Sequence, residues 1–325
     1  YLRVLDAGTG DGTIKSNVIK SFHKYHPYTS LLITGKEISY EDLKNTLDKM
    51  PDRFVEHPNL LVTMTNVKFS ELGLIENSKK IKNRKVKEFN LVLNSNNSFD
   101  FNDQISGVSL GNFIKKNWGI EIDNKSRTSY SNPCVIRIYR KDNEKHLKQF
   151  INNDYENNNY DLIIASQAYR AASSVKVKVN NVIGPLMRLL NKSGQLLVTH
   201  SCGGESIQKI LKLAFKDKEA FPNNAKDIIE YLKDNPFGEN NKYNYGKPIN
   251  YTFKFKKAPD QTVTELFGQN TDAKWANILY VGQIPEKDIH VLESNTRLHN
   301  KVKRAIDNAG QISFKNEIFS IKKIR

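Results

Sequence analysis

Four residues near the start of the chain stand at alternate positions and could form a ligand-binding turn, Asp6-x-Gly8-x-Gly10-x-Gly12. An apolar run precedes them and a helical pattern of apolar residues follows, so the glycines lie between a predicted strand and a predicted helix. Glycine has no side chain, and this lets a bound molecule come close to the backbone. The pattern therefore predicts a small-molecule site at the end of the first strand.

Three kinds of ligand compete for such a turn. A phosphate-binding P-loop needs glycine directly before Lys-Ser, but Ile14 precedes Lys15-Ser16, so the backbone cradle for phosphate would be lost. A dinucleotide site needs G-x-G-x-x-G, and Thr13 stands where its third glycine would let helix and strand approach closely. The third pattern, an acidic residue and then glycines at alternate positions, is the one that the residues spell.

The segment resembles motif I of the class I S-adenosylmethionine-dependent methyltransferases. The resemblance implies S-adenosylmethionine as the cofactor, with the backbone of the three glycines against it and Asp6 facing its cationic methionyl end. Residues 35–39, Gly-Lys-Glu-Ile-Ser, resemble the family's second motif, and Glu37 would accept hydrogen bonds from the two ribose hydroxyls. Asn66, after the third predicted strand, would meet the adenine amino group, with a plain turn residue as the alternative interpretation.

Two later segments extend the resemblance. Residues 160–169 look like motif IV, which implies that Ser166 lies at the cofactor, and residues 189–198 look like the family's leader loop and fifth strand. Here Lys192-Ser193-Gly194 replaces the usual Pro-Gly-Gly. Together the similar segments cover about 200 residues in the family's order.

Tyr169 and His200 are the residues that we expect to meet the methyl acceptor, because they follow the fourth and fifth predicted strands. His200 could take or hold a proton, since an imidazole titrates near neutral pH. A core-facing ring for Tyr169 and a histidine held by local backbone for His200 are the structural alternatives. Motif IV lacks the Asp/Asn-Pro-Pro-aromatic run of base-amine methyltransferases, no Pro-Cys stands near it, and no carboxylates cluster there for a metal.

Continuous apolar strands that alternate with helices must position these residues. The predicted strands cover residues 2–5, 30–37, 60–64, 161–166, 195–200, 276–281 and 317–321, and the predicted helices 14–22, 40–50, 179–190 and 297–308. Such alternation is typical of a parallel sheet covered on both faces. The sequence therefore predicts an α/β fold with a Rossmann-like, seven-stranded, mostly parallel sheet, helices on both faces and inserted cap segments.

Two polar stretches interrupt the alternation. We expect residues 1–72, 160–215 and 273–325 to form the core that binds S-adenosylmethionine, and residues 73–159 and 216–272 to be insertions. Both are too long for plain connections. Within them, residues 134–139 and 251–256 read as strands and residues 225–233 as a helix. We interpret the insertions as a substrate-binding cap over the carboxyl edge of the sheet, where such folds place ligands.

Composition limits the partners. The chain has 325 residues with a formal net charge of +15. It contains no run of about 20 apolar residues that could span a membrane. Its two cysteines, Cys134 and Cys202, lie far apart without a CxxC, so no disulfide framework or zinc site is indicated and a cytoplasmic location is expected. The charge suggests nucleic acid, but abundant Asn, Lys and Ile also follow from AT-rich codons.

These observations predict an S-adenosylmethionine-dependent methyltransferase that acts on a nitrogen or oxygen of a small-molecule acceptor. Methylation of RNA or protein is the alternative, supported by the net charge and by the basic segment 79–87. A domain that binds the cofactor without transferring a methyl group is a third possibility. We expect no metal and no membrane partner, and the sequence does not indicate the oligomeric state.

Overall fold

The computed structural model describes residues 2–8, 13–26, 31–36, 45–50, 60–74, 80–81, 84–93, 99–101, 133–140, 159–166, 168–169, 174–201, 224–235, 242–256, 296–297, 300–301, 304 and 311–324. The chain divides into two compact units. Unit 1 consists of Tyr1–Ala165, Pro185–Leu196 and Lys322–Arg325, and unit 2 of Ser166–Gly184 and Leu197–Ile321. Strands β10 (Leu190–Ser201) and β13 (Gln311–Lys323) contribute residues to both units.

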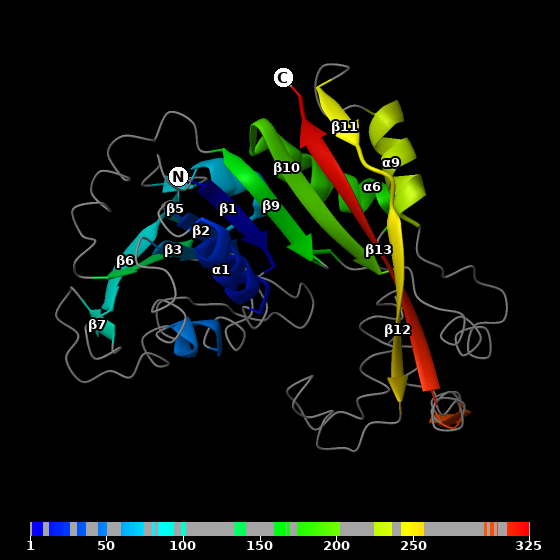
Figure 1. Cartoon of the computed structure of the whole chain (residues 1–325), viewed down its shortest axis with the longest axis horizontal. Helices are drawn as coiled ribbons and strands as arrows, with labels where there is room; N and C mark the ends of the chain where they lie inside the picture. The colour runs from blue at the N-terminus through cyan, green and yellow to red at the C-terminus, as the bar shows by residue number, and fades with distance from the viewer. Residues whose placement is uncertain are drawn as a thin grey trace. The chain divides into compact units, whose positions relative to one another are not determined.

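Unit 1 is built on a sheet with a Rossmann-like strand order (Figure 1). Its central strands are β1 (Leu2–Ala7), β2 (Leu31–Lys36), β3 (Leu60–Thr65) and β9 (Tyr160–Ser166). Strand β1 pairs in parallel with β2 and β9, and β2 pairs in parallel with β3. Read from the other end of the sheet, the strand order is β3-β2-β1-β9-β10. This is the 3-2-1-4-5 arrangement of doubly wound dinucleotide-binding folds. The predicted α/β class and mostly parallel sheet are confirmed.

The strands form where the sequence is continuously apolar, because both of their faces are buried. Every residue of β2 and β3 is buried. One face packs Ile33 and Val62 with Ile19 of helix α1 (Thr13–Tyr25), and the other packs Leu32 with Leu61. The sheet thereby holds the carboxyl ends of its strands in a common register.

Three strands from the first predicted insertion extend this sheet beyond β3. They are β8 (Cys134–Arg140), β6 (Lys87–Leu93) and β7 (Phe99–Phe101). The 3-10 helix η1 (Phe69–Leu74) precedes all three in the chain. Strand β8 is antiparallel to β3 and parallel to β6, and β7 is antiparallel to β6. The sheet therefore has more strands than the seven predicted. The basic segment 79–87 contains a separate hairpin of β4 (Lys80–Ile81) and β5 (Arg84–Lys85).

The turn before Gln195 is tighter than the sequence suggested. Strand β10 was expected to begin at Gln195, but it begins at Leu190, and Ser193 has a φ of 67° within it. A side chain on Gly194 would place its Cβ 2.7 Å from the carbonyl oxygen of Tyr160 and 2.9 Å from that of Asn191. Glycine is required at position 194 because backbone atoms fill the space on that side.

Unit 2 contains most of the helical residues after β9. Helix α6 (Val175–Lys178), the π-helical turn η3 (Val179–Ile183) and α7 (Gly184–Arg188) follow one another, although the last four residues of α7 belong to unit 1. The predicted helix 179–190 thus begins earlier and ends at Arg188. Strands β11 (Tyr243–Tyr245) and β12 (Ile249–Lys256) both pair with β13, and β12 runs antiparallel to it along its length (Figure 1).

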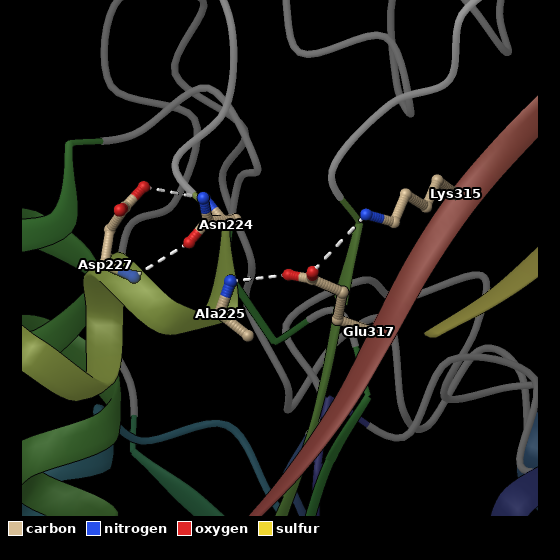
Figure 2. Close-up of polar contacts among 5 residues, drawn as sticks. All are labelled: Asn224, Ala225, Asp227, Lys315 and Glu317. Atoms are coloured by element: carbon tan, nitrogen blue, oxygen red, sulfur yellow. Dashed lines mark hydrogen bonds and ion pairs between the residues drawn. The ribbon is translucent and has the colours of Figure 1, made fainter. Parts of the chain in front are cut away.

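Helix α9 (Ala225–Asp234) has a well-defined beginning, which Figure 2 shows. Asn224 and Asp227 form a capping box, and Glu317 of β13 accepts a hydrogen bond from the backbone N–H of Ala225. Lys315 forms an ion pair with Glu317 at 3.7 Å. Acidic side chains at a helix N-terminus satisfy free N–H groups and complement the helix dipole. The predicted helix 225–233 and strand 251–256 are confirmed.

Several predicted elements lie outside the described residues. They include the strand 276–281 and parts of the helices 40–50 and 297–308. In and beside the two predicted helices, residues 45–48, 296–297, 300–301 and 304 are described and are helical. The cap formed by the two insertions remains a prediction. Among the residues that the structure describes, no helix is long and apolar enough to cross a membrane.

Candidate functional site

The candidate cofactor site lies in unit 1, where three parallel strands end side by side. Ala7, Lys36 and Thr65 occupy the same register position at the ends of β1, β2 and β3. Gly8 follows directly, and its backbone N–H donates a hydrogen bond of 3.0 Å to the carbonyl oxygen of Lys36. This bond extends the pairing of β1 with β2 by one residue, up to Gly8.

Gly8 has a φ of 87°, a conformation that side chains disfavour. The glycine predicted from the motif is therefore required by the backbone itself. The bare Cα also leaves the turn open to close approach by a ligand. Gly10, Gly12 and Glu37 lie outside the described residues, and their roles remain predictions.

Asp6 lies near the end of β1, two residues before Gly8, and is only 1% exposed. It pairs in register with Gly35 of β2 and Ile164 of β9, so the central strand of the sheet places it. A carboxylate in so poorly solvated a position interacts strongly with cations and hydrogen-bond donors. This environment suits the role predicted for Asp6.

Asn66 directly follows β3 and is buried. Its Oδ1 accepts a hydrogen bond of 2.9 Å from the backbone N–H of Cys134, while the hydroxyl of Thr65 donates to the carbonyl oxygen of Cys134 at 3.1 Å. Asn66 therefore anchors the start of β8. This is a structural role that the sequence did not indicate, and its predicted contact with adenine remains a prediction.

Two buried lysines in unit 1 were missed by sequence reasoning. Lys15 of α1 is fully buried and places its Nζ 2.8 Å from the Sδ of Met64. Lys36, at the end of β2, places its Nζ 4.2 Å from the ring centre of Phe69. Lysines usually stay in solvent, so only the fold reveals that these two are enclosed. The cation–π contact offsets part of the cost of burying Lys36.

A separate side-chain cluster lies in unit 2 and joins the two predicted catalytic residues. The hydroxyl of Tyr169 lies 3.1 Å from Nδ1 of His200, and the centres of the two rings are 5.7 Å apart. His200 lies on β10 and is fully buried, whereas Tyr169 is partly exposed. Ser166, the last residue of β9, also belongs to unit 2 and is partly exposed.

Lys178 completes this cluster, and no sequence signal singled it out. It is fully buried on α6, and its Nζ lies 5.5 Å from the ring centre of Tyr169. We call Tyr169, Lys178 and His200 the tyrosine cluster. Of the three, Tyr169 is partly exposed, whereas Lys178 and His200 are fully buried.

The tyrosine cluster has the components of a proton-handling site. Either the Tyr169 hydroxyl donates to Nδ1 or a protonated Nδ1 donates to the hydroxyl oxygen, depending on the tautomer of His200. In both cases the imidazole orients the hydroxyl. The Nζ of Lys178 lies beside the ring of the same tyrosine. The functional and the structural interpretations of Tyr169 and His200 both stay predictions.

Other chemistries receive no support from the described residues. Burial raises the pKa of the Cys134 thiol from 9.0 to about 12, although Lys87 partly opposes the shift. The thiol is therefore protonated at neutral pH and is a poor nucleophile. In the ranges that the structure describes, no group of three or more His, Cys, Asp or Glu residues could hold a metal ion.

Comparisons with known proteins gave matches only among solved structures. Neither a protein family profile nor a curated protein sequence matches the chain. A Bacillus halodurans protein, provisionally assigned as a methyltransferase, shares 9% identity and a TM-score of 0.41, over 99% of this chain and 92% of that one. An S-adenosylmethionine-dependent methyltransferase from Thiobacillus denitrificans, in complex with S-adenosylhomocysteine, has 10% identity, a TM-score of 0.35 and coverages of 99% and 85%.

A third structure is phosphoethanolamine N-methyltransferase 2 of Haemonchus contortus in complex with S-adenosylmethionine. Its identity is 11% and its TM-score 0.34, and the match covers 100% of this chain but 49% of that one. All three of these proteins carry methyltransferase assignments.

Proposed function

We propose that this chain is an S-adenosylmethionine-dependent methyltransferase that transfers a methyl group to a nitrogen or oxygen of a small-molecule acceptor. The observation that carries the proposal is the turn after β1, with Gly8 at a φ of 87° and the buried Asp6 at the strand end. This turn stands at the carboxyl edge of a sheet with Rossmann-like strand order, where such folds bind their ligands.

The residues present fit S-adenosylmethionine better than a phosphate-bearing cofactor. The cofactor carries a sulfonium and an ammonium group, and the buried carboxylate of Asp6 is suited to positive charge. The open backbone at Gly8 allows close approach. Glu37, one residue beyond the end of β2, is proposed to bind the ribose, and Asn66 and Ser166 to contact the cofactor from the ends of β3 and β9.

When bound, S-adenosylmethionine supplies an electrophilic methyl group on a sulfonium that leaves as a neutral thioether. The protein must then hold the acceptor in line and exclude water, and little further chemistry is needed. In our proposal the Tyr169 hydroxyl touches the acceptor and orients its lone pair. His200 holds that hydroxyl and takes up, through it, the proton that the acceptor releases.

Calorimetric titration of the whole chain with S-adenosylmethionine, S-adenosylhomocysteine and NAD tests the cofactor. We expect the first two to bind and NAD not to bind. Asp6→Asn, which keeps the shape but removes the charge, should weaken S-adenosylmethionine binding by about tenfold or more. The exposed Lys20→Gln on α1 is the control and should leave the affinity unchanged. Binding of NAD alone, or of none of the three, would contradict the proposal.

Transfer is tested separately with cofactor that carries a labelled methyl group. Panels of small amines, phenols and carboxylic acids would be compared with RNA and with protein as acceptors. We expect label in a small molecule, and Tyr169→Phe should remove it while leaving cofactor affinity intact. Label in RNA or protein alone would keep the methyltransferase and overturn the acceptor class. Cofactor binding without transfer to any acceptor would favour a cofactor-binding domain.

A further inference from the structure

A basic groove lies in unit 2, and its lining shares no residue with the sites described above. It has a volume of about 640 Å³ and is lined by Thr296, Arg297, Asn300, Lys301 and Arg304. All five are exposed and helical. Residues at i, i+3, i+4 and i+7 share one face of a helix, so Arg297, Asn300, Lys301 and Arg304 form a single ridge. Three of these four side chains are cations.

The charges on this ridge differ from those on an ordinary solvated helix. On α9 the exposed Lys226 has an acidic neighbour four residues on, and its Nζ lies 3.7 Å from Glu230. On the ridge the corresponding pair, Arg297 and Lys301, has like charges, and Arg304 adds another three residues later. Between Arg297 and Arg304 the sequence contains no Asp or Glu, and the nearest acidic residues are Glu293, four residues before the ridge, and Asp307, three residues after it. Like charges at these spacings destabilise a helix, so an external anion would relieve them.

We propose that the basic groove binds the phosphate backbone of RNA. Arg297 and Arg304 are seven residues apart, which is about 10 Å along a helix. A nucleic-acid strand in a duplex presents one phosphate about every 3.4 Å along its axis, so three cations meet about three successive phosphates. A single small anion would use only part of this ridge. The net charge of +15 adds long-range attraction for a polyanion.

The polar residues of the groove favour RNA over DNA. Thr296 and Asn300 place a hydroxyl and an amide among the cations, and both can exchange hydrogen bonds with a ribose 2′-hydroxyl, which DNA lacks. None of the five described lining residues is aromatic. We therefore expect contacts with the RNA backbone rather than stacking on bases. This proposal does not depend on methyl transfer, because it concerns backbone contacts only.

The test is fluorescence anisotropy of the whole chain with labelled single-stranded RNA of mixed sequence, about 20 nucleotides long, in about 50 to 200 mM KCl. The triple variant Arg297→Gln, Lys301→Gln, Arg304→Gln should bind more weakly by at least tenfold. Its plot of log affinity against log salt should be shallower by about 2, because each phosphate contact contributes about 0.7 for single strands. Circular dichroism would verify that the variant is folded.

A charge-matched control separates the groove from the overall charge. Lys20→Gln, Lys192→Gln and Lys226→Gln together remove three exposed cations elsewhere and should leave the salt dependence unchanged. The conservative variant Arg297→Lys, Arg304→Lys should keep most of the binding. Equal losses in the two triple variants, or no RNA binding by the wild type, would overturn the proposal.

Two further arms test the identity of the ligand. DNA of the same sequence should bind more weakly than RNA, and Asn300→Ala should reduce that difference. Equal binding of DNA would overturn the assignment to RNA. Competition by inorganic phosphate well below the concentration that ionic strength explains would indicate a small-anion site and would also overturn it.

Discussion

The turn after β1 and the tyrosine cluster of unit 2 are stabilised in different ways, the first by backbone atoms and the second by side chains. The turn is defined by its backbone: Gly8 has a positive φ and donates a backbone hydrogen bond to Lys36. The tyrosine cluster is defined by side chains, with Tyr169 and His200 in contact although they are 31 residues apart. Backbone requirements leave a local trace in the sequence, whereas side-chain contacts depend on the fold.

Removing the Tyr169 hydroxyl should have the largest effect. Tyr169→Phe keeps the ring beside Lys178 but deletes the contact with His200, so we expect turnover to fall by about 10² to 10⁴ with unchanged cofactor affinity. The measurement is the rate of S-adenosylhomocysteine formation with an acceptor found in the labelled-methyl screen. When Tyr169→Phe is already present, adding His200→Asn should lower the turnover only a little further. Additive losses would show that His200 acts independently of the tyrosine.

A β-branched side chain at the turn should have the next largest effect. Gly8→Val forces a side chain into a φ of 87°, and we expect S-adenosylmethionine affinity to fall by about 30-fold or more. Calorimetry measures the loss. Asn tolerates positive φ better than other residues, so Gly8→Asn should lose less. Equal losses for Val and Asn would contradict the backbone explanation.

A second glycine sharpens the comparison because it is also required by the backbone but lies outside the proposed site. Gly194→Ala would push Cβ against the carbonyl oxygens of Tyr160 and Asn191. We expect the free energy of unfolding to fall by about 1 to 3 kcal/mol, measured by urea denaturation. The cofactor affinity of the folded variant should be unchanged. A loss of affinity without a loss of stability would move the ligand toward this turn.

The smallest expected effect concerns a side-chain contact that supports the fold only. Glu317→Gln keeps an oxygen for the Ala225 N–H but removes the charge at the start of α9 and the ion pair with Lys315. We expect a loss of about 1 kcal/mol in unfolding free energy, less than for Gly194→Ala. Asn224→Ala should cost a similar amount through the lost cap. A larger change in turnover than in stability would give Glu317 a role in function.

The sequence predicted the elements whose pattern is local. Continuous apolar runs identified β1, β2, β3 and β9, and the alternating run at residues 251–256 identified β12, because periodicity records how many faces of a strand are buried. The glycine turn was also predicted from a local pattern, since the positive φ of Gly8 strongly favours glycine. Tyr169 and His200 were proposed from their places after strands. The structure instead places His200 within β10, and it shows that the two side chains touch.

The missed features depend on contacts between distant residues. Nothing in the sequence around Lys178 or Lys15 indicates that either is fully buried, because a lysine in a helical pattern is usually solvated. Strands β6 and β7 lie in a polar stretch, and they join the sheet through pairing of β6 with β8 and of β7 with β6. The structural use of Asn66 depends on the backbone of Cys134, which is 68 residues away.

The pairing of β1 with β9 has a consequence for folding during synthesis. Val4 pairs with Leu162, so the central strand of unit 1 must wait for 158 residues before its second neighbour has been made. At about 5 to 20 residues per second, the ribosome needs roughly 8 to 30 s for that stretch. For all of that time one edge of β1 carries unpaired backbone groups that can bind other chains. The nascent chain is therefore most prone to aggregate before residue 166 emerges, and slower translation upstream of β9 lengthens that interval.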